Sequence, residues 1–237
     1  MGSGVKVIAH RGSSGLRSEN TLSAFGLALE EGSQMIETDL RLTRDRLIVL
    51  SHDSYSPKGT SVELSTFSRL CEDFPRGNCR LLSLKEALDE FGGRIDFNLE
   101  LKASSDEGNS LLAKAAIREV SDRGLLSNIL FSSFEMKILA KIRAESSDAR
   151  LGVLLDEDSA SGLRDTIGLR PESIHPSKRR VSLTQIEAWH SEGLLVNVYT
   201  VDDPREIEEM WSMGVDGIFT NYPARAITLI HGFDALT

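Results

Sequence analysis

The stretch VKVIAHRGSSGLRSENTLSAF, residues 5–25, begins as an apolar segment typical of a buried β-strand, and this segment ends at His10 and Arg11. A polar loop that contains glycine follows, and a helical pattern of apolar residues then begins near Thr21. Strand, loop and helix form one β/α unit. An imidazole and a guanidinium at the end of a buried strand direct attention to the polar residues that end the other strands.

Seven further strand-like segments recur along the chain, and helical patterns separate most of them. The eight predicted strands span residues 5–10, 35–42, 95–102, 128–134, 150–156, 172–176, 194–201 and 216–221. The predicted helices span residues 21–32, 83–92, 110–124, 135–145, 183–193 and 204–214. Eight strands in 237 residues predict an α/β fold, a (β/α)₈ or TIM barrel. A doubly wound open sheet is the main alternative, but it usually has fewer strands, and no glycine-rich dinucleotide loop follows the first strand.

Two segments depart from this repeat. Residues 46–53, RLIVLSHD, follow the second strand after a short turn and are predicted to form a hairpin arm. The stretch from Asp53 to about Leu82 is predicted to be one long irregular loop, and loops of that length are often functional. We expect residues 5–237 to form a single domain. Residues 1–4, MGSG, are interpreted as a cloning remnant, so that a native leader could have been removed.

Composition excludes several classes of protein. The net charge of −9 argues against a nucleic-acid binder, which needs a basic face. No run of apolar residues approaches the roughly 18 that a membrane span requires, so stable membrane insertion is not expected. The chain has two cysteines, Cys71 and Cys79, and a disulfide between them is one alternative. We favour two reduced thiols in a cytoplasmic protein.

The polar residues at the predicted strand ends form a recognisable set, because the active sites of TIM barrels lie at the carboxyl ends of the strands. Glu37 and Asp39 are two residues apart in the second strand and therefore project from the same face. Glu100 and Lys102 have the same spacing in the third strand, and the hairpin arm ends near His52. A barrel brings consecutive strand ends side by side, so we expect these groups at one mouth with His10 and Arg11.

This set of groups indicates cleavage of a phosphate ester. Three carboxylates share a pocket of low dielectric only when something neutralises them, and one hard divalent cation, Mg²⁺ or Ca²⁺, suits ligands that are all oxygen. Arg11 offers a fork that matches phosphate oxygens, and Lys102 supplies a point charge. Two histidines can exchange protons near neutral pH as acid and base.

The motifs resemble those of the glycerophosphodiester phosphodiesterase family. The series HRG, ENT, E-x-D, HD and E-x-K occurs in this order, and the similarity runs from Val5 to about Ala224. The resemblance implies a (β/α)₈ barrel that uses a divalent cation to hydrolyse glycerophosphodiesters to sn-glycerol 3-phosphate and an alcohol. It also implies a small-molecule substrate and a cyclic glycerol phosphate intermediate that water then opens.

The resemblance also implies roles for particular residues. His10 and His52 correspond to the acid/base pair, and the metal ligands correspond to Glu37, Asp39 and Glu100. Arg11 and Lys102 fall at phosphate-binding positions, and Glu19 and Asn20 of the ENT motif are expected to support the metal ligands. Phe134 and Tyr199 are predicted to contact the substrate, with Ser132 nearby; Tyr199 stands where the family often has tryptophan. His175 is interpreted as structural or pocket-lining, and His190 and His231 as surface residues.

Two other functions stay open at this point. A lysophospholipase D or sphingomyelinase D-like enzyme would share the barrel and the histidine pair but would need an apolar entrance for a lipid. A barrel that only binds a phosphorylated ligand would have no need of two histidines that exchange protons. The sequence assigns neither the alcohol, the preferred metal, the individual roles of the two histidines, nor the oligomeric state.

Overall fold

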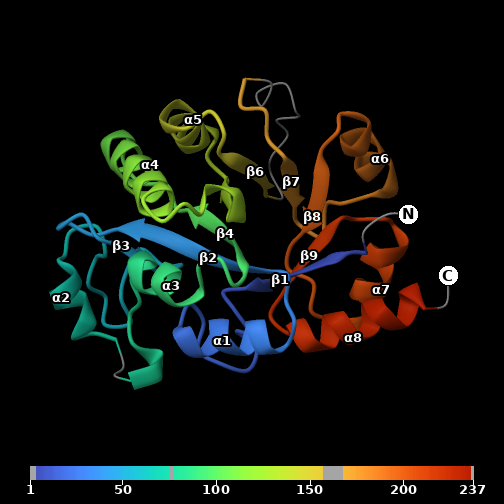
Figure 1. Ribbon diagram of the computed structural model, residues 1–237, viewed down its shortest axis with the longest axis horizontal. Helices are drawn as coiled ribbons and strands as arrows, with labels where there is room; N and C mark the ends of the chain where they lie inside the picture. Colours follow the sequence, from blue (N-terminus) through green and yellow to red (C-terminus); the bar gives the residue numbers. More distant parts are fainter. Residues whose placement is uncertain (1–3, 75–76, 157–167, 236–237) are drawn as a thin grey trace.

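The structure is a computed structural model that describes residues 4–74, 77–156 and 168–235. Of the predicted cloning remnant, residues 1–3 lie outside the described residues. Among the described segments, eight strands run parallel to one another, and their bounds are β1 (Lys6–His10), β2 (Met35–Leu42), β4 (Asp96–Leu101), β5 (Ile129–Ser133), β6 (Arg150–Leu155), β7 (Ser173–Pro176), β8 (Leu195–Val198) and β9 (Gly217–Thr220). Pairing of β1 with both β2 and β9 closes the ring, so the predicted TIM barrel is confirmed (Figure 1).

The hairpin arm is also confirmed. β3 (Ile48–Leu50) pairs antiparallel with the end of β2, where Leu42 lies opposite Ile48. The arm extends β2 beyond the closed ring and carries the chain toward the barrel mouth. Backbone hydrogen bonds fix both of its ends, one of them from the Ser51 amide to the Asp39 carbonyl at 3.0 Å.

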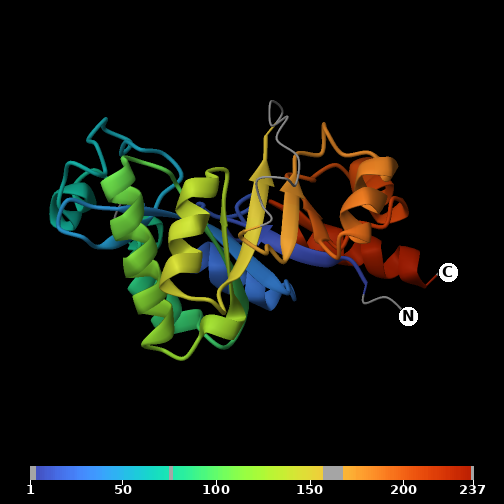
Figure 2. The same cartoon turned by 90° about the horizontal axis from the view of Figure 1, so that it is seen from above.

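Helices cover the outside of the ring, and α8 lies at the opposite end of the molecule from α2 (Figure 1 and Figure 2). Their bounds are α1 (Leu22–Glu30), α2 (Phe67–Cys71), α3 (Leu84–Phe91), α4 (Asp106–Ser121), α5 (Met136–Glu145), α6 (Leu183–Ser191), α7 (Pro204–Ser212) and α8 (Pro223–Asp234), with short 3₁₀ helices at Gly77–Cys79 and Leu126–Asn128. The six predicted helices are confirmed. None of the described helices is long and apolar enough to cross a membrane.

The prediction of one irregular stretch from Asp53 to Leu82 is wrong in part. It contains α2, whose first turn is capped by the Thr66 hydroxyl accepting a hydrogen bond from the Arg69 amide at 3.3 Å. Five residues are too few to produce a helical period in the sequence. Helix α8 was not predicted either, although Pro223 stands at its first turn, where proline is well tolerated. Cys71 and Cys79 are free and exposed, as favoured.

The main core lies between the strands and the helices. Phe25 of α1 is completely buried and packs edge-on against Phe91 of α3 and Phe97 of β4, with ring centroids 6.1 and 5.9 Å away. Helix α3 begins with a reciprocal cap in which Ser83 and Glu86 bond to each other's backbone amides. This packing fixes α1 and α3 beside the strands that carry the polar residues.

The barrel interior holds a second, smaller apolar cluster and a buried histidine. Ile8, Met35, Leu130 and Phe219 pack together inside the ring. His175 lies beside them, and its Nε2 is 2.8 Å from the Ser173 hydroxyl and 3.2 Å from the Asn197 amide nitrogen. Gly152 leaves the space that this ring occupies, since a Cβ there would come within 2.5 Å of the His175 ring. His175 is therefore a core residue.

We predict that His175 makes the protein less stable at mildly acidic pH. Burial lowers the pKa of His175 to about 3 in the folded protein, whereas an unfolded chain would titrate near the usual value of about 6.5. The unfolded chain therefore binds more protons as the pH falls below 6.5, and folding stability declines toward the folded pKa. Between about pH 7 and pH 5 this one group should cost about 2 kcal/mol.

The measurement is urea unfolding of the wild type and of His175→Gln at both pH values. The variant does not titrate at this position, so the free energy of unfolding of the wild type should fall by about 2 kcal/mol more than that of the variant. Equal pH dependence of the two proteins would contradict the prediction.

Candidate active site

Three carboxylates meet at the carboxyl ends of β2 and β4. One oxygen of each of Glu37, Asp39 and Glu100 lies within 4.8 Å of the others, and all three residues are buried. The register explains this meeting, because Asp39 pairs with Glu100 across the two strands and Glu37 pairs with His10 of β1. The alternation of β2 directs Glu37 and Asp39 into the barrel mouth, while Ile36 and Leu40 join the outer core.

Burying these carboxylates disturbs their ionisation. Burial, reinforced by the charges of Asp39 and Glu100, raises the pKa of Glu37 well above its usual value. Burial also raises the pKa of Glu100. It would do the same for Asp39, but Lys102 and Arg11 outweigh it and hold the pKa of Asp39 below its usual value. If all three carboxylates were ionised, they would carry one more negative charge than the two neighbouring cations supply, and the raised pKa values of Glu37 and Glu100 oppose that state.

Lys102 and Arg11 lie against this cluster from two sides. Lys102 Nζ is 2.9 Å from Asp39 Oδ1 and also bonds Glu100. Arg11 Nε is 3.2 Å from Asp39 Oδ2, and its Nη1 is 2.9 Å from the exposed Glu19. Lys102 therefore pairs with carboxylates of both β2 and β4.

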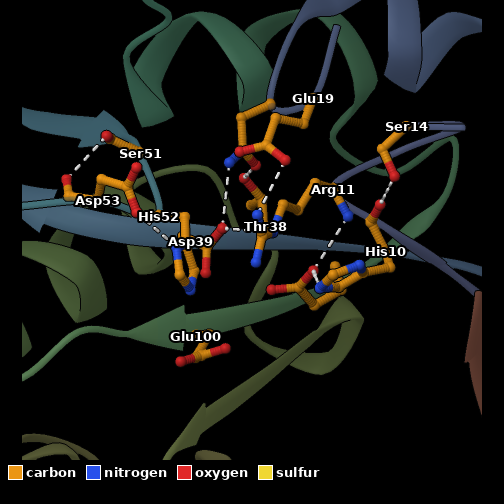
Figure 3. A network of polar contacts seen from close by, with 12 residues as sticks. His10, Arg11, Ser14, Glu19, Thr38, Asp39, Ser51, His52, Asp53 and Glu100 are labelled. Carbon is orange, nitrogen blue, oxygen red and sulfur yellow. Dashed lines mark hydrogen bonds and ion pairs between the residues drawn. The ribbon is translucent and has the colours of Figure 1, made fainter. Parts of the chain in front are cut away.

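The HRG and ENT motifs together contact two of the three carboxylates, Glu37 and Asp39. Figure 3 shows Arg11 and Glu19 of these motifs beside Asp39. Arg11 and Asn20 both have a φ of 56°, a left-handed conformation that is costly for residues other than glycine. The Asn20 amide donates to the Arg11 carbonyl at 3.1 Å, and the Arg11 amide donates to Glu37 Oε2 at 3.0 Å. The Asn20 side chain donates to Asp39 at 3.1 Å and accepts from Thr38 at 2.6 Å. The strained backbone is therefore tied to the orientation of two carboxylates.

His10 is held by a chain of hydrogen bonds from the opposite end of the sequence. Its Nδ1 is 2.8 Å from the side-chain oxygen of Asn221, and Asn221 Nδ2 donates to Asp202 at 2.6 Å. Because the carboxylate of Asp202 accepts from the Asn221 amide nitrogen, the Asn221 oxygen faces His10 and accepts its Nδ1–H. Nε2 of His10 is left as a proton acceptor, 3.9 Å from Glu37. Burial, followed by the charge of Arg11, lowers the pKa of His10, so the ring is neutral.

His52 has a more open environment. Its side chain is 42 % exposed, and its Nδ1 lies 2.8 Å from Asp53. Its backbone carbonyl accepts two hydrogen bonds from the Arg41 guanidinium, at 3.0 and 2.8 Å, which fix the chain where it leaves the hairpin arm. The two histidines therefore lie on either side of the carboxylate cluster, one enclosed and one facing solvent (Figure 3).

A cavity of about 220 Å³ joins these groups. It is bordered by both histidines, the two cations, Glu37, Glu100 and Asn98, and on its apolar side by Phe134, Leu154, Tyr199 and Phe219. Phe134 and Tyr199 meet edge to face with their ring centroids 5.9 Å apart. Ser132 is completely buried behind the cavity and accepts a hydrogen bond from Asn98 at 2.9 Å.

Several polar residues at this mouth were not singled out from the sequence. Asn221 and Asp202 orient His10, Asp53 contacts His52, and Asn98 borders the cavity. Asn221 follows β9 directly, and this position at the carboxyl end of a strand is the sequence feature that could have identified it as a site residue. His190 pairs with Asp216 at 2.8 Å, and His231 is exposed on α8, so both are surface residues as interpreted.

The sequence matches the model of the "Glycerophosphoryl diester phosphodiesterase family" over residues 10–225. A glycerophosphodiester phosphodiesterase of Bacillus altitudinis is 27% identical, with 94% of this chain and 97% of the relative covered. A human lysophospholipase D is 23% identical, over 97% of this chain and 87% of the relative.

Solved structures share the fold. A phosphodiesterase of Oleispira antarctica, in complex with the product sn-glycerol-3-phosphate, has a TM-score of 0.86 and 23% identity, with 96% and 97% of the two chains covered. A glycerophosphodiester phosphodiesterase of Parabacteroides distasonis has a TM-score of 0.88 and 24% identity, with 98% and 100% covered. At these identities the likeness establishes the fold alone. The family match spans most of the sequence, and this chain belongs to the glycerophosphoryl diester phosphodiesterase family.

Proposed function

We propose that the protein hydrolyses glycerophosphodiesters to sn-glycerol 3-phosphate and an alcohol, with the help of one divalent cation. Membership of the family makes it a phosphoric diester hydrolase. The observation that supports the detailed proposal best is the arrangement of two histidines around one cavity, which is also bordered by Glu37 and Glu100 of the cluster of three buried carboxylates. A protein that only binds a phosphorylated ligand would not need such a pair.

The carboxylates fit a hard cation such as Mg²⁺ or Ca²⁺. The three carboxylates offer oxygen atoms as metal ligands. No hydrogen-bond donor within the described residues reaches the buried Oε1 of Glu37, so this oxygen has no partner there. Glu37, Asp39 and Glu100 would hold the cation. When bound, it would supply positive charge that polarises a phosphoryl oxygen and favours ionisation of a neighbouring hydroxyl.

His10 is proposed as the general base. Its Nδ1–H is engaged by Asn221, so Nε2 faces the cavity as the acceptor, and the neutral ring can take the proton of the glycerol hydroxyl as that oxygen attacks phosphorus. Asn221 and Asp202 would fix the tautomer throughout. A glycerol phosphate moiety suits the cavity of about 220 Å³.

His52 is proposed as the general acid. As the bond between phosphorus and the leaving oxygen breaks, His52 would give its proton to that oxygen and release a neutral alcohol. Asp53, 2.8 Å from Nδ1, would stabilise the protonated ring before transfer. Water would then open the cyclic glycerol phosphate, giving its proton to one histidine while the other protonates the ring oxygen. Arg11 and Lys102 border the cavity and would stabilise charge on the phosphoryl oxygens.

A lysophospholipase D activity is the second candidate. The exposed Phe134 and its neighbour Tyr199 provide an apolar side to the cavity, where an acyl chain on the glycerol could leave. This candidate predicts faster choline release from lysophosphatidylcholine than from glycerophosphocholine. The proposed function predicts the reverse order.

We predict release of sn-glycerol 3-phosphate from glycerophosphocholine in the presence of Mg²⁺ or Ca²⁺, and loss of that release in EDTA. A coupled glycerol 3-phosphate dehydrogenase assay measures the product. Re-addition of the cation should restore the rate. No release from several glycerophosphodiesters with either metal would refute the proposed function.

We predict that the cation stabilises the fold through the carboxylate cluster, because a ligand that binds only the folded state raises its melting temperature. Saturating Ca²⁺ or Mg²⁺ should raise the melting temperature of the wild type, measured by differential scanning fluorimetry, and should not raise that of Glu37→Gln. The control is Glu30→Gln on the surface of α1. An equal rise in both variants would contradict the site.

We predict that His10→Ala lowers kcat by a factor of about 10² to 10⁴, the usual contribution of a general base. Asn221→Ala should lower kcat less, by a factor of about 10, because the ring remains but its tautomer is no longer fixed. Both variants should keep the cation-induced rise in melting temperature, since neither removes a carboxylate. An Asn221→Ala enzyme with wild-type kcat would contradict the positioning role.

A further inference from the structure

A second and larger cavity lies directly beside the active site. Its volume is about 570 Å³, and it is formed between the loop that follows β1 and the segment that follows β3. His52 borders both this cavity and the smaller one of the active site. His10, Glu37 and Glu100 border only the smaller one. The histidine proposed to protonate the departing alcohol therefore stands at the boundary between the two spaces.

The wall of the larger cavity is built by fixed structure. Tyr55 forms a β-bridge with Ser61, and the buried Ser56 donates a hydrogen bond to Asp73 at 2.6 Å. Asp73 is in turn paired with Arg69 of α2 at 2.7 Å. The turn that carries Tyr55 is thus tied to α2, and it presents a ring that is 59 % exposed to the cavity and solvent.

The charges around the cavity favour a cation. Glu19 and Asp53 both border it. Glu19 is paired with Arg11 at 2.9 Å and Asp53 lies 2.8 Å from His52, but their side chains are 51 % and 79 % exposed, so both carboxylates stay accessible to a cation. Arg80 is the cation among the described residues that line it, and this guanidinium is paired with Glu86 at 2.7 Å. Tyr55 and Phe74 add aromatic rings, whose faces attract ammonium groups.

We propose that this cavity receives the departing alcohol and selects alcohols that carry an ammonium group, with Tyr55 as a specificity-determining residue. The inference rests on the proposed function, because it places the glycerol phosphate in the smaller cavity and the alcohol on the far side of His52. A quaternary or primary amine would lie against the Tyr55 ring and near the carboxylates of Glu19 and Asp53. A neutral alcohol such as glycerol would lose both interactions.

The test compares kcat/KM for glycerophosphocholine and glycerophosphoglycerol in the wild type, Tyr55→Ala, Tyr55→Phe and the matched control Leu183→Ala. Leu183 is an exposed apolar residue of α6 that does not border this cavity. Tyr55→Ala should lower kcat/KM for glycerophosphocholine about tenfold, the loss expected for one cation–π contact. Its value for glycerophosphoglycerol should stay within about twofold of the wild type. Tyr55→Phe keeps the ring and should behave like the wild type, as should Leu183→Ala.

A second measurement needs no variant. Tetramethylammonium should inhibit the wild type competitively against glycerophosphocholine. Two results would overturn this inference while the proposed function stands. One is a Tyr55→Ala variant whose preference between the two substrates equals that of the wild type. The other is the absence of inhibition by tetramethylammonium. A wild type that turns over neither substrate would overturn both.

Discussion

The burial of three carboxylates at one rim of the barrel is the constraint on which the site depends. Glu37, Asp39 and Glu100 meet because β1, β2 and β4 pair in parallel and in register, and Lys102 and Arg11 offset only part of their charge. Isolated buried charges are costly, so the cluster either takes up protons, as the raised pKa values of Glu37 and Glu100 favour, or gains further positive charge. A divalent cation would provide this charge at the place where a phosphodiester can be attacked.

The same cluster explains the strained conformation of the loop after β1. The left-handed conformations of Arg11 and Asn20 direct one backbone amide to Glu37 and one side-chain amide to Asp39, so the loop orients the carboxylates and not only itself. His10 and His52 then stand on either side of the cluster in different environments. One is buried and held by Asn221, and the other is exposed beside Asp53. This asymmetry is the basis for the proposed roles of His10 as base and His52 as acid.

Most of the barrel could be predicted from the sequence, because the strands are marked by short apolar runs and the helices by their period. The carboxylates were found for the same reason, since Glu37 and Asp39 share a face at a spacing of two. Asn221 and Asp202 were missed because they reach His10 only through the pairing of β1 with β9, which joins the two ends of the chain. The five residues of α2 are too few to show a helical periodicity in the sequence. The cavity beside His52 could not be predicted because it depends on how the segment after β3 folds back on the barrel.

The most direct test of this account is anomalous diffraction from crystals grown with Mn²⁺, which resembles Mg²⁺ in its choice of oxygen ligands. The account predicts a single strong anomalous peak in contact with oxygen atoms of Glu37, Asp39 and Glu100. A peak elsewhere, or none at all while Lys102 still contacts Asp39 and Glu100, would contradict the claim that a cation completes this cluster.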